Sequence, residues 1–266
     1  MKKISIGQYY NADSFLHRMD PRVKLVLLVV YMVSIFAAKL PWGLVPVSAI
    51  LALMVVGCRV PLKTIAGACG PIAFFVVLTF IANIALVRTG DVLFHLLWLP
   101  VTLDGVVGAL LLGYRMFALM LAGAIFALVT SPVSITDGTE RLLSPLERFG
   151  APIHELAMMY TIAIRFVPIL AGEMRHIMNA QVSRGAALDE GKFMQRAKVF
   201  VSMIVPLFAS ALRHSEELAN AMEARCYVGG EGRTHYHVLK LRRQDYVAIG
   251  VFVTYLASLV VIAVAL

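Results

Sequence analysis

Long apolar stretches alternate with short polar ones along most of this chain. Five apolar stretches are long and clean enough to cross a bilayer, at residues 23–38, 42–57, 70–87, 105–129 and 246–266. A hydrocarbon core about 30 Å thick needs roughly 20 apolar residues per helix, and tilted or bundled helices can be somewhat shorter. The pattern therefore predicts an all-α integral membrane protein with about five transmembrane helices.

Residues 152–184 and 193–225 are predicted to form two further long helices outside the hydrocarbon. Apolar residues recur in both at helical spacing, but charged residues such as Glu155, Arg165 and Arg213 interrupt or bound the apolar runs. A charge at mid-bilayer costs roughly 2.5–3.5 kcal/mol on insertion scales. Both stretches are therefore interpreted as amphipathic helices beside the membrane.

Composition agrees with a membrane protein. Hydrophobic residues make up 60% of the chain and charged residues 15%, so water could not cover it as a single soluble globule. The predicted organisation is transmembrane helices over residues 1–130, a helical domain over residues 131–243, and a last transmembrane helix over residues 244–266.

Lysine and arginine positions predict the orientation, because positively charged loops tend to stay in the cytoplasm. The residues on one side are Lys2, Lys3, Arg18, Arg22, Lys24, Arg59 and Lys63, and only Lys39 and Arg88 mark the other side. The N-terminus and residues 131–243 are therefore predicted to be cytoplasmic. This bias and attraction to anionic lipid account for the net charge of +8, so no nucleic-acid partner is predicted.

A short pattern occurs twice, 41 positions apart. Residues 179–185 read NAQVSRG and residues 220–226 read NAMEARC, so each long helix ends near an arginine, Arg184 or Arg225. A cation near a helix C-terminus gains roughly 0.3–1 kcal/mol from the macrodipole and can be purely structural. The planar fork of an arginine also suits docking against carboxylates and carbonyls of another protein. The duplication favours docking, at two similar partner sites.

These motifs resemble those of the transmembrane T component of energy-coupling factor (ECF) transporters, the vitamin and metal-ion importers of prokaryotes. Family members carry two Ala-Arg-Gly-like motifs, matched here by Ser183-Arg184-Gly185 and by Ala224-Arg225-Cys226, which departs from the pattern at Cys226. The run Asp20-Pro21-Arg22 also resembles the family. Physically, Asp20 can cap the helix that Pro21 opens.

The resemblance implies a coupling subunit in a prokaryotic cell membrane. In that family, two arginine-tipped coupling helices sit in grooves of two ABC-type ATPases, and the membrane part holds a substrate-binding S component. ATP-driven motion passes through the T component to the S component, which carries the specificity for a vitamin, cobalt or nickel. The resemblance thus implies that residues 131–243 are the coupling domain, that the six motif residues contact the ATPases, and that this chain is not an enzyme.

The residues themselves argue against an ATP or metal site. Between Gly185 and Gly191 there is one residue too many for a phosphate-binding loop, and Phe193 stands where a hydroxyl is needed. His235 and His237, two apart, do not form a ligand set, and the three cysteines lack metal-ligand spacing. No cofactor or metal is predicted.

Arg115, inside the fourth predicted span, keeps another class open: a stand-alone channel or secondary transporter with its own substrate path. An ionisable residue within a span is by default a functional hypothesis. Contact with the S component or a snorkelled side chain is the interpretation we favour. A transporter with its own path usually has repeated halves with broken helices or several intramembrane charges, and this sequence shows neither.

Overall fold

Two compact units make up the chain. The computed structural model describes residues 9–10, 12–37, 41–86, 92–96, 99–185, 193–229 and 240–265. One unit consists of Met1–Leu142 with Val238–Leu266, and the other of Leu143–His237. The three-part organisation with boundaries at 131 and 243 stays a prediction. Lys2, Lys3, Lys39 and Arg88, on which the orientation partly rests, lie outside the described residues.

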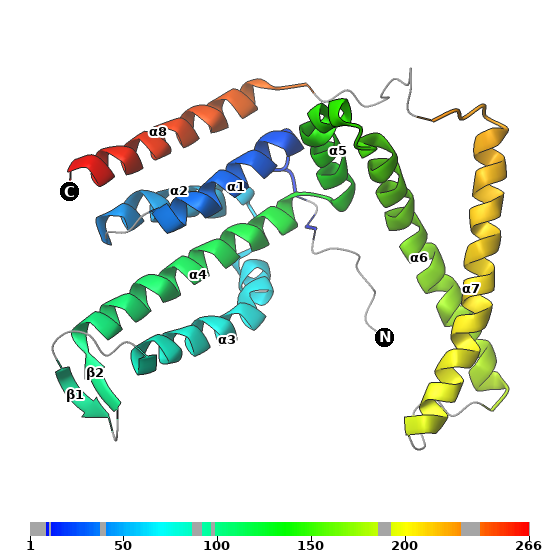
Figure 1. The fold of residues 1–266 in the computed structure, drawn as a ribbon, viewed down its shortest axis with the longest axis horizontal. Coiled ribbons are helices and arrows are strands. Elements are labelled where there is room, and N and C mark those ends of the chain that lie inside the picture. The colour runs from blue at the N-terminus through cyan, green and yellow to red at the C-terminus, as the bar shows by residue number, and fades with distance from the viewer. Residues whose placement is uncertain are drawn as a thin grey trace. The chain divides into compact units, whose positions relative to one another are not determined.

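Helices dominate both units (Figure 1). The first unit contains α1 (Pro21–Ala37), a 3-10 helix (Pro41–Gly43), α2 (Leu44–Cys58), α3 (Leu62–Leu86), α4 (Leu103–Val129) and α8 (Arg243–Ala265), and α5 (Pro132–Leu143) ends at its boundary. The second contains a 3-10 helix (Ser144–Phe149), α6 (Ile153–Ser183) and α7 (Phe193–Glu223). The all-α prediction is confirmed, with one unpredicted addition: β1 (Val92–Leu96) pairs antiparallel with β2 (Leu99–Thr102).

Helix α4 lies at the centre of the first unit and packs against α1, α2 and α3. Its buried positions are small or aliphatic, among them Ala118, Ala122 and Ile125, which allows neighbouring helices to approach closely. They join Tyr31 of α1 and Tyr255 of α8 in one cluster of buried side chains. The core of this unit is therefore built by helices from both ends of the sequence.

Polar side chains inside this core find partners within the protein. The Tyr31 hydroxyl donates to the carbonyl of Val47 at 3.1 Å, and the hydroxyls of Ser34 and Tyr255 lie 2.6 Å apart. No water is available in hydrocarbon, so each such group needs a protein partner. These bonds connect α1 to α2 and α1 to α8.

The outward faces of these helices are apolar. Val33 of α1 is 64% exposed, Val56 of α2 is 77% exposed and Leu86 of α3 is 79% exposed. Apolar surface on this scale suits lipid and not water, which agrees with the predicted integral membrane protein. By length and composition, α4, α6 and α8 could each cross a membrane, whereas α2 and Phe74–Ile84 are shorter apolar helices.

Helix α6 is apolar enough to be a candidate membrane span, although the sequence patterns predict that it lies outside the hydrocarbon. Its 31 residues include an apolar part long enough for a span, although the charged residues within it favour a place outside the hydrocarbon. That place, and the number of five spans, stay predictions. Both α6 and α7 run unbroken through Pro168 and Pro206, so neither proline marks the end of a helix.

A buried carboxylate joins the start of α1 to the start of α8. Asp245 is fully buried, and its two oxygens accept hydrogen bonds from the backbone N–H of Asp20 at 2.8 Å and of Arg242 at 2.7 Å. Asp20 in turn accepts from the backbone N–H of Arg22 at 2.9 Å, which confirms the predicted cap of α1. Residues 225 positions apart are thus held together where α1 and α8 begin.

Candidate functional site: two arginine-tipped helices

The first arginine, Arg184, follows the last turn of α6. Its backbone N–H donates to the carbonyls of Ala180 at 3.2 Å and Gln181 at 3.1 Å, and the N–H of Gly185 donates to Val182 at 2.9 Å. Gly185 has a φ of +82°, the left-handed conformation that commonly ends a helix. The hydroxyl of Ser183 donates to the carbonyl of Asn179 at 3.0 Å.

The second arginine, Arg225, follows α7 with the same geometry. The N–H of Cys226 donates to Glu223 at 2.8 Å, and the N–H of Tyr227 donates to Met222 at 3.1 Å. These two bonds form a Schellman motif, in which Arg225 is the last residue of the cap and Cys226 is the left-handed residue after it. Cys226 has a φ of +57°. The missing glycine at this position therefore leaves the turn intact.

All six predicted site residues are exposed at these two helix ends: Ser183, Arg184, Gly185, Ala224, Arg225 and Cys226. Neither arginine forms an ion pair with another described residue. Because the backbone cap already satisfies the last carbonyls, each guanidinium is available to an outside acceptor. The structure places the six residues in two separate groups and not in one cluster.

A polar contact connects the two helices at equivalent positions. Nε2 of His214 on α7 lies 2.7 Å from Oε1 of Glu173 on α6, and these residues are 41 positions apart, the spacing of the repeat. The hydroxyl of Ser210 also donates to Glu173 Oε1 at 3.0 Å. Sequence inspection missed this contact, although the repeat spacing pairs Glu173 with His214.

The contact lies at the same distance from both helix ends. Glu173 precedes Arg184 by 11 residues, and His214 precedes Arg225 by 11 residues, which at 1.5 Å per residue is roughly 16 Å along each helix. The two helices contact each other where they cross and run in opposite directions (Figure 1). The arginines therefore lie on opposite sides of the Glu173–His214 contact.

Both helices leave large apolar side chains uncovered. The exposed residues include Leu156 and Tyr160 on α6 and Val205, Phe208 and Leu212 on α7. No residue of α6 is buried within the described structure. Such a surface is typical of a helix that packs against another protein or a membrane.

Comparisons with known proteins assign the family. The sequence model of CbiQ, the cobalt transport protein family, matches residues 12–236. The chain belongs to this CbiQ/EcfT family. Three similar proteins are each named energy-coupling factor transporter transmembrane protein EcfT: one from Ruminiclostridium cellulolyticum (40% identical, covering 96% of both chains), one from Clostridium kluyveri (41% identical, covering 93% of this chain and 92% of the other) and one from Bacillus subtilis (38% identical, covering 92% of both).

As a CbiQ/EcfT member, this chain is a transmembrane component of an energy-coupling factor transporter. The matched residues include both helix ends and the Glu173–His214 contact. The resemblance derived from the two motifs is thereby confirmed at the level of the family.

Arg115 lies half-buried on α4 and interacts with another residue of the chain. A cation that is engaged within the protein does not by itself indicate a substrate path. Among the described residues, no group of three or more His, Cys, Asp or Glu side chains could hold a metal ion. His235 and His237 lie outside the described residues.

Proposed function

We propose that this chain couples two ABC-type ATPases to a membrane-embedded S component in an importer of a vitamin or a metal ion. The chain itself is proposed to hydrolyse nothing and to bind neither ATP nor the transported solute. Its family supports a transporter subunit, and the paired helix ends support the link to two ATPases.

The matched geometry of Arg184 and Arg225 is the observation that carries this proposal. Both arginines are exposed, and each lies at a capped helix end, 11 residues from the Glu173–His214 contact. They therefore offer the same chemistry on opposite sides of that contact. A pair of similar partners needs such a pair of similar surfaces. A single regulatory partner would need only one.

The proposed mechanism uses two long helices that contact each other around Glu173 and His214. When ATP draws the ATPases together, each docked arginine moves with its ATPase. The Glu173–His214 contact holds α6 and α7 together at one place. A displacement of the two ends in different directions would therefore change the angle between the helices about that contact. The uncovered apolar side chains of both helices would pass that change to the S component packed on them.

The orientation proposed here places both arginines and the N-terminus in the cytoplasm, with residues 131–243 as the coupling domain. Cys226 is exposed, so it can report the side in a variant whose other two cysteines, Cys58 and Cys69, are replaced by serine. A membrane-impermeant maleimide should label Cys226 in inside-out vesicles and not in intact cells, with Cys226→Ser as the control. Labelling in intact cells would contradict the orientation.

Charge reversal tests the docking directly. The double variant Arg184→Glu and Arg225→Glu should lose the ATPases on affinity purification, because both electrostatic contacts become repulsive. The matched control reverses two exposed arginines elsewhere on α6, Arg165→Glu and Arg175→Glu, and should retain the ATPases. Equal retention by both double variants would refute the docking proposal.

A further inference from the structure

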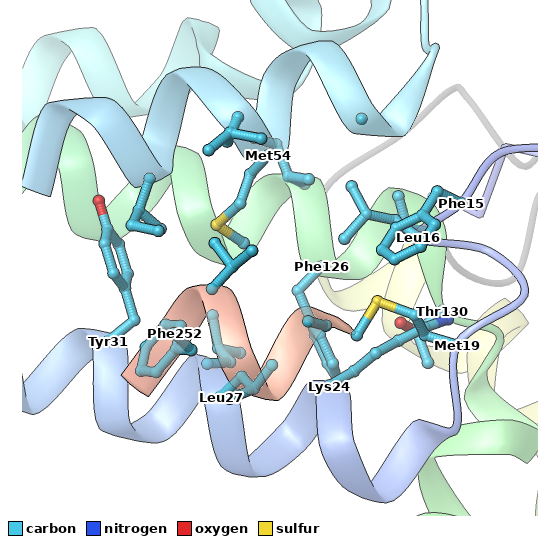
Figure 2. Close-up of a pocket in the computed structure, with 18 of the residues that line it drawn as sticks. Phe15, Leu16, Met19, Lys24, Leu27, Tyr31, Met54, Phe126, Thr130 and Phe252 are labelled. Atoms are coloured by element: carbon cyan, nitrogen blue, oxygen red, sulfur yellow. The ribbon is translucent and has the colours of Figure 1, made fainter. Parts of the chain in front are cut away.

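An apolar cavity of about 360 Å³ lies in the first unit among α1, α2, α4 and α8 (Figure 2). Leu53, Val247 and Val251 line it and are 58%, 53% and 42% exposed. The cavity is therefore open on the outer surface of α2 and α8. That surface is apolar, and both helices belong to the predicted transmembrane set, so lipid tails have access to the opening.

One end of the cavity is polar. Figure 2 shows Lys24 of α1 and Thr130, which follows α4, beside Met19 at the same end. Lys24 is 8% exposed and Thr130 is 2% exposed. The ammonium of Lys24 makes one hydrogen bond within the described structure, to the carbonyl of His17 at 3.2 Å, and the hydroxyl of Thr130 makes none.

Buried donors of this kind normally have acceptors. An ammonium offers three N–H donors, so two remain on Lys24 among the described residues. Two nearby carboxylates, those of Asp20 and Asp245, attract Lys24 electrostatically. Both accept backbone N–H bonds, and neither forms an ion pair or a hydrogen bond with the Lys24 ammonium. Two under-used donors, Lys24 and Thr130, thus meet at the end of an apolar cavity.

A second apolar hollow in the same unit provides a contrast. It has a volume of about 380 Å³ and lies between α1 and α8, where its lining includes Val33, Ser34 and Leu256. None of its lining residues is charged. Of these two cavities, the first combines apolar walls with a buried cation. This combination matches an amphiphile with a negative head.

We propose that the cavity of α1, α2, α4 and α8 binds one acyl chain of an anionic phospholipid, whose phosphate is held by Lys24 and Thr130. The polar end lies where α1 begins and α4 ends, which is the predicted cytoplasmic side. Anionic lipids are present in the cytoplasmic leaflet and give it a negative surface potential. The lipid would brace the junction of the N-terminal segment with α8, independently of how the ATPases dock.

The first test compares lipid retention. The purified chain is loaded from nanodiscs of phosphatidylglycerol or phosphatidylcholine, diluted into mild detergent and examined by native mass spectrometry. Wild type should retain one phosphatidylglycerol and little phosphatidylcholine. Lys24→Met and Thr130→Val should each reduce phosphatidylglycerol retention by about fivefold, and Ala248→Phe, which fills the cavity, should reduce retention of both lipids.

Matched controls use positions that do not line the cavity. Lys63→Met removes an exposed lysine of α3, and Ala257→Phe adds the same bulk on the exposed side of α8; both should retain lipid as wild type does. Equal retention of the two lipids by wild type, or unchanged retention in Lys24→Met and Ala248→Phe, would overturn the proposal.

The second test asks what occupies the opening in the assembled transporter. A photoreactive amino acid at Leu53, activated in native membranes, should add the mass of a phospholipid. An adduct with another protein would overturn the proposal, because a partner side chain would then fill the cavity. This result does not depend on ATPase binding, which the arginine variants test separately.

Discussion

Cys226 occupies after Arg225 the same backbone position that Gly185 occupies after Arg184. Both have positive φ values, +57° and +82°, and each N–H donates to the carbonyl three residues earlier, at 2.8 and 2.9 Å. A residue with a Cβ enters this region less readily than glycine. The second helix end therefore keeps its turn because the Schellman bonds of α7 hold Cys226 there.

Substitutions at these two positions should have opposite effects on stability. Cys226→Gly should raise the free energy of unfolding by about 1 kcal/mol, and Gly185→Ala should lower it by a similar amount. A Cβ at Gly185 would meet no atom within 4 Å, so the cost is conformational only. Thermal unfolding of the purified chain measures both, with Cys226→Ala as the control for loss of the thiol. A glycine variant no more stable than the alanine variant would contradict the argument.

Asp245 should be among the least replaceable side chains of the first unit. Asp245→Ala removes the acceptor of two backbone N–H groups, and hydrogen bonds to charged groups are worth about 1.5–3 kcal/mol each. We expect the free energy of unfolding to fall by about 3 kcal/mol. We also expect proteases to gain access to the segment before α1, because the backbone N–H of Asp20 loses its acceptor. Asp245→Asn, which keeps one acceptor oxygen, should fall between. Asp13→Ala, at an exposed carboxylate paired with Arg18, serves as the control and should change little.

Local signals explain what could be predicted from the sequence. The helices expected over 152–184 and 193–225 are observed at Ile153–Ser183 and Phe193–Glu223, because the apolar periodicity and the end signals act within a few residues. The predicted span at 70–87 is instead part of a longer helix, Leu62–Leu86. The strands β1 and β2 were missed because their leucine-rich sequence carries no alternation that marks a strand.

Contacts between residues far apart in the sequence could not be predicted from local sequence patterns. The link from Asp20 to Asp245 spans 225 positions, and nothing near either residue indicates the other. The arginine ends were predicted because the motif occurs twice, and the same spacing connects Glu173 to His214. The Lys24 and Thr130 pair appears only once α1 and α4 are packed together.

The contact between α6 and α7 should depend on pH. The hydrogen bond to Glu173, with a longer one to Glu217, raises the pKa of His214 above its ordinary value near 6.5. A raised folded-state pKa means that the stabilising contribution is complete below the unfolded pKa and is lost as pH rises through the folded pKa. Hydrogen exchange of the α6 and α7 amides should therefore become faster above about pH 6.5. The increase should exceed the one expected from the pH dependence of the intrinsic exchange rate.

His214→Gln isolates this effect, because glutamine can still donate to Glu173 but does not titrate. We expect the variant to lose the extra pH dependence. His176→Gln changes an exposed histidine of α6 and should keep it. Identical pH profiles for wild type and His214→Gln would show that the imidazolium contributes nothing to the contact.

Among the helical glycines whose surroundings the structure describes, Gly138 should tolerate substitution by alanine least. A Cβ there would lie 3.0 Å from Cβ of Pro21, 3.2 Å from its carbonyl carbon and 3.3 Å from the nitrogen of Arg22. Backbone atoms cannot move aside cheaply, so Gly138→Ala should separate α5 from the start of α1 and lower the unfolding free energy by about 1–3 kcal/mol. Gly172→Ala on α6, where a Cβ meets nothing within 4 Å, should instead stabilise by up to about 1 kcal/mol through helix propensity. Thermal unfolding compares the two variants. A Gly138→Ala protein as stable as Gly172→Ala would show that Gly138 does not lie this close to Pro21 and Arg22.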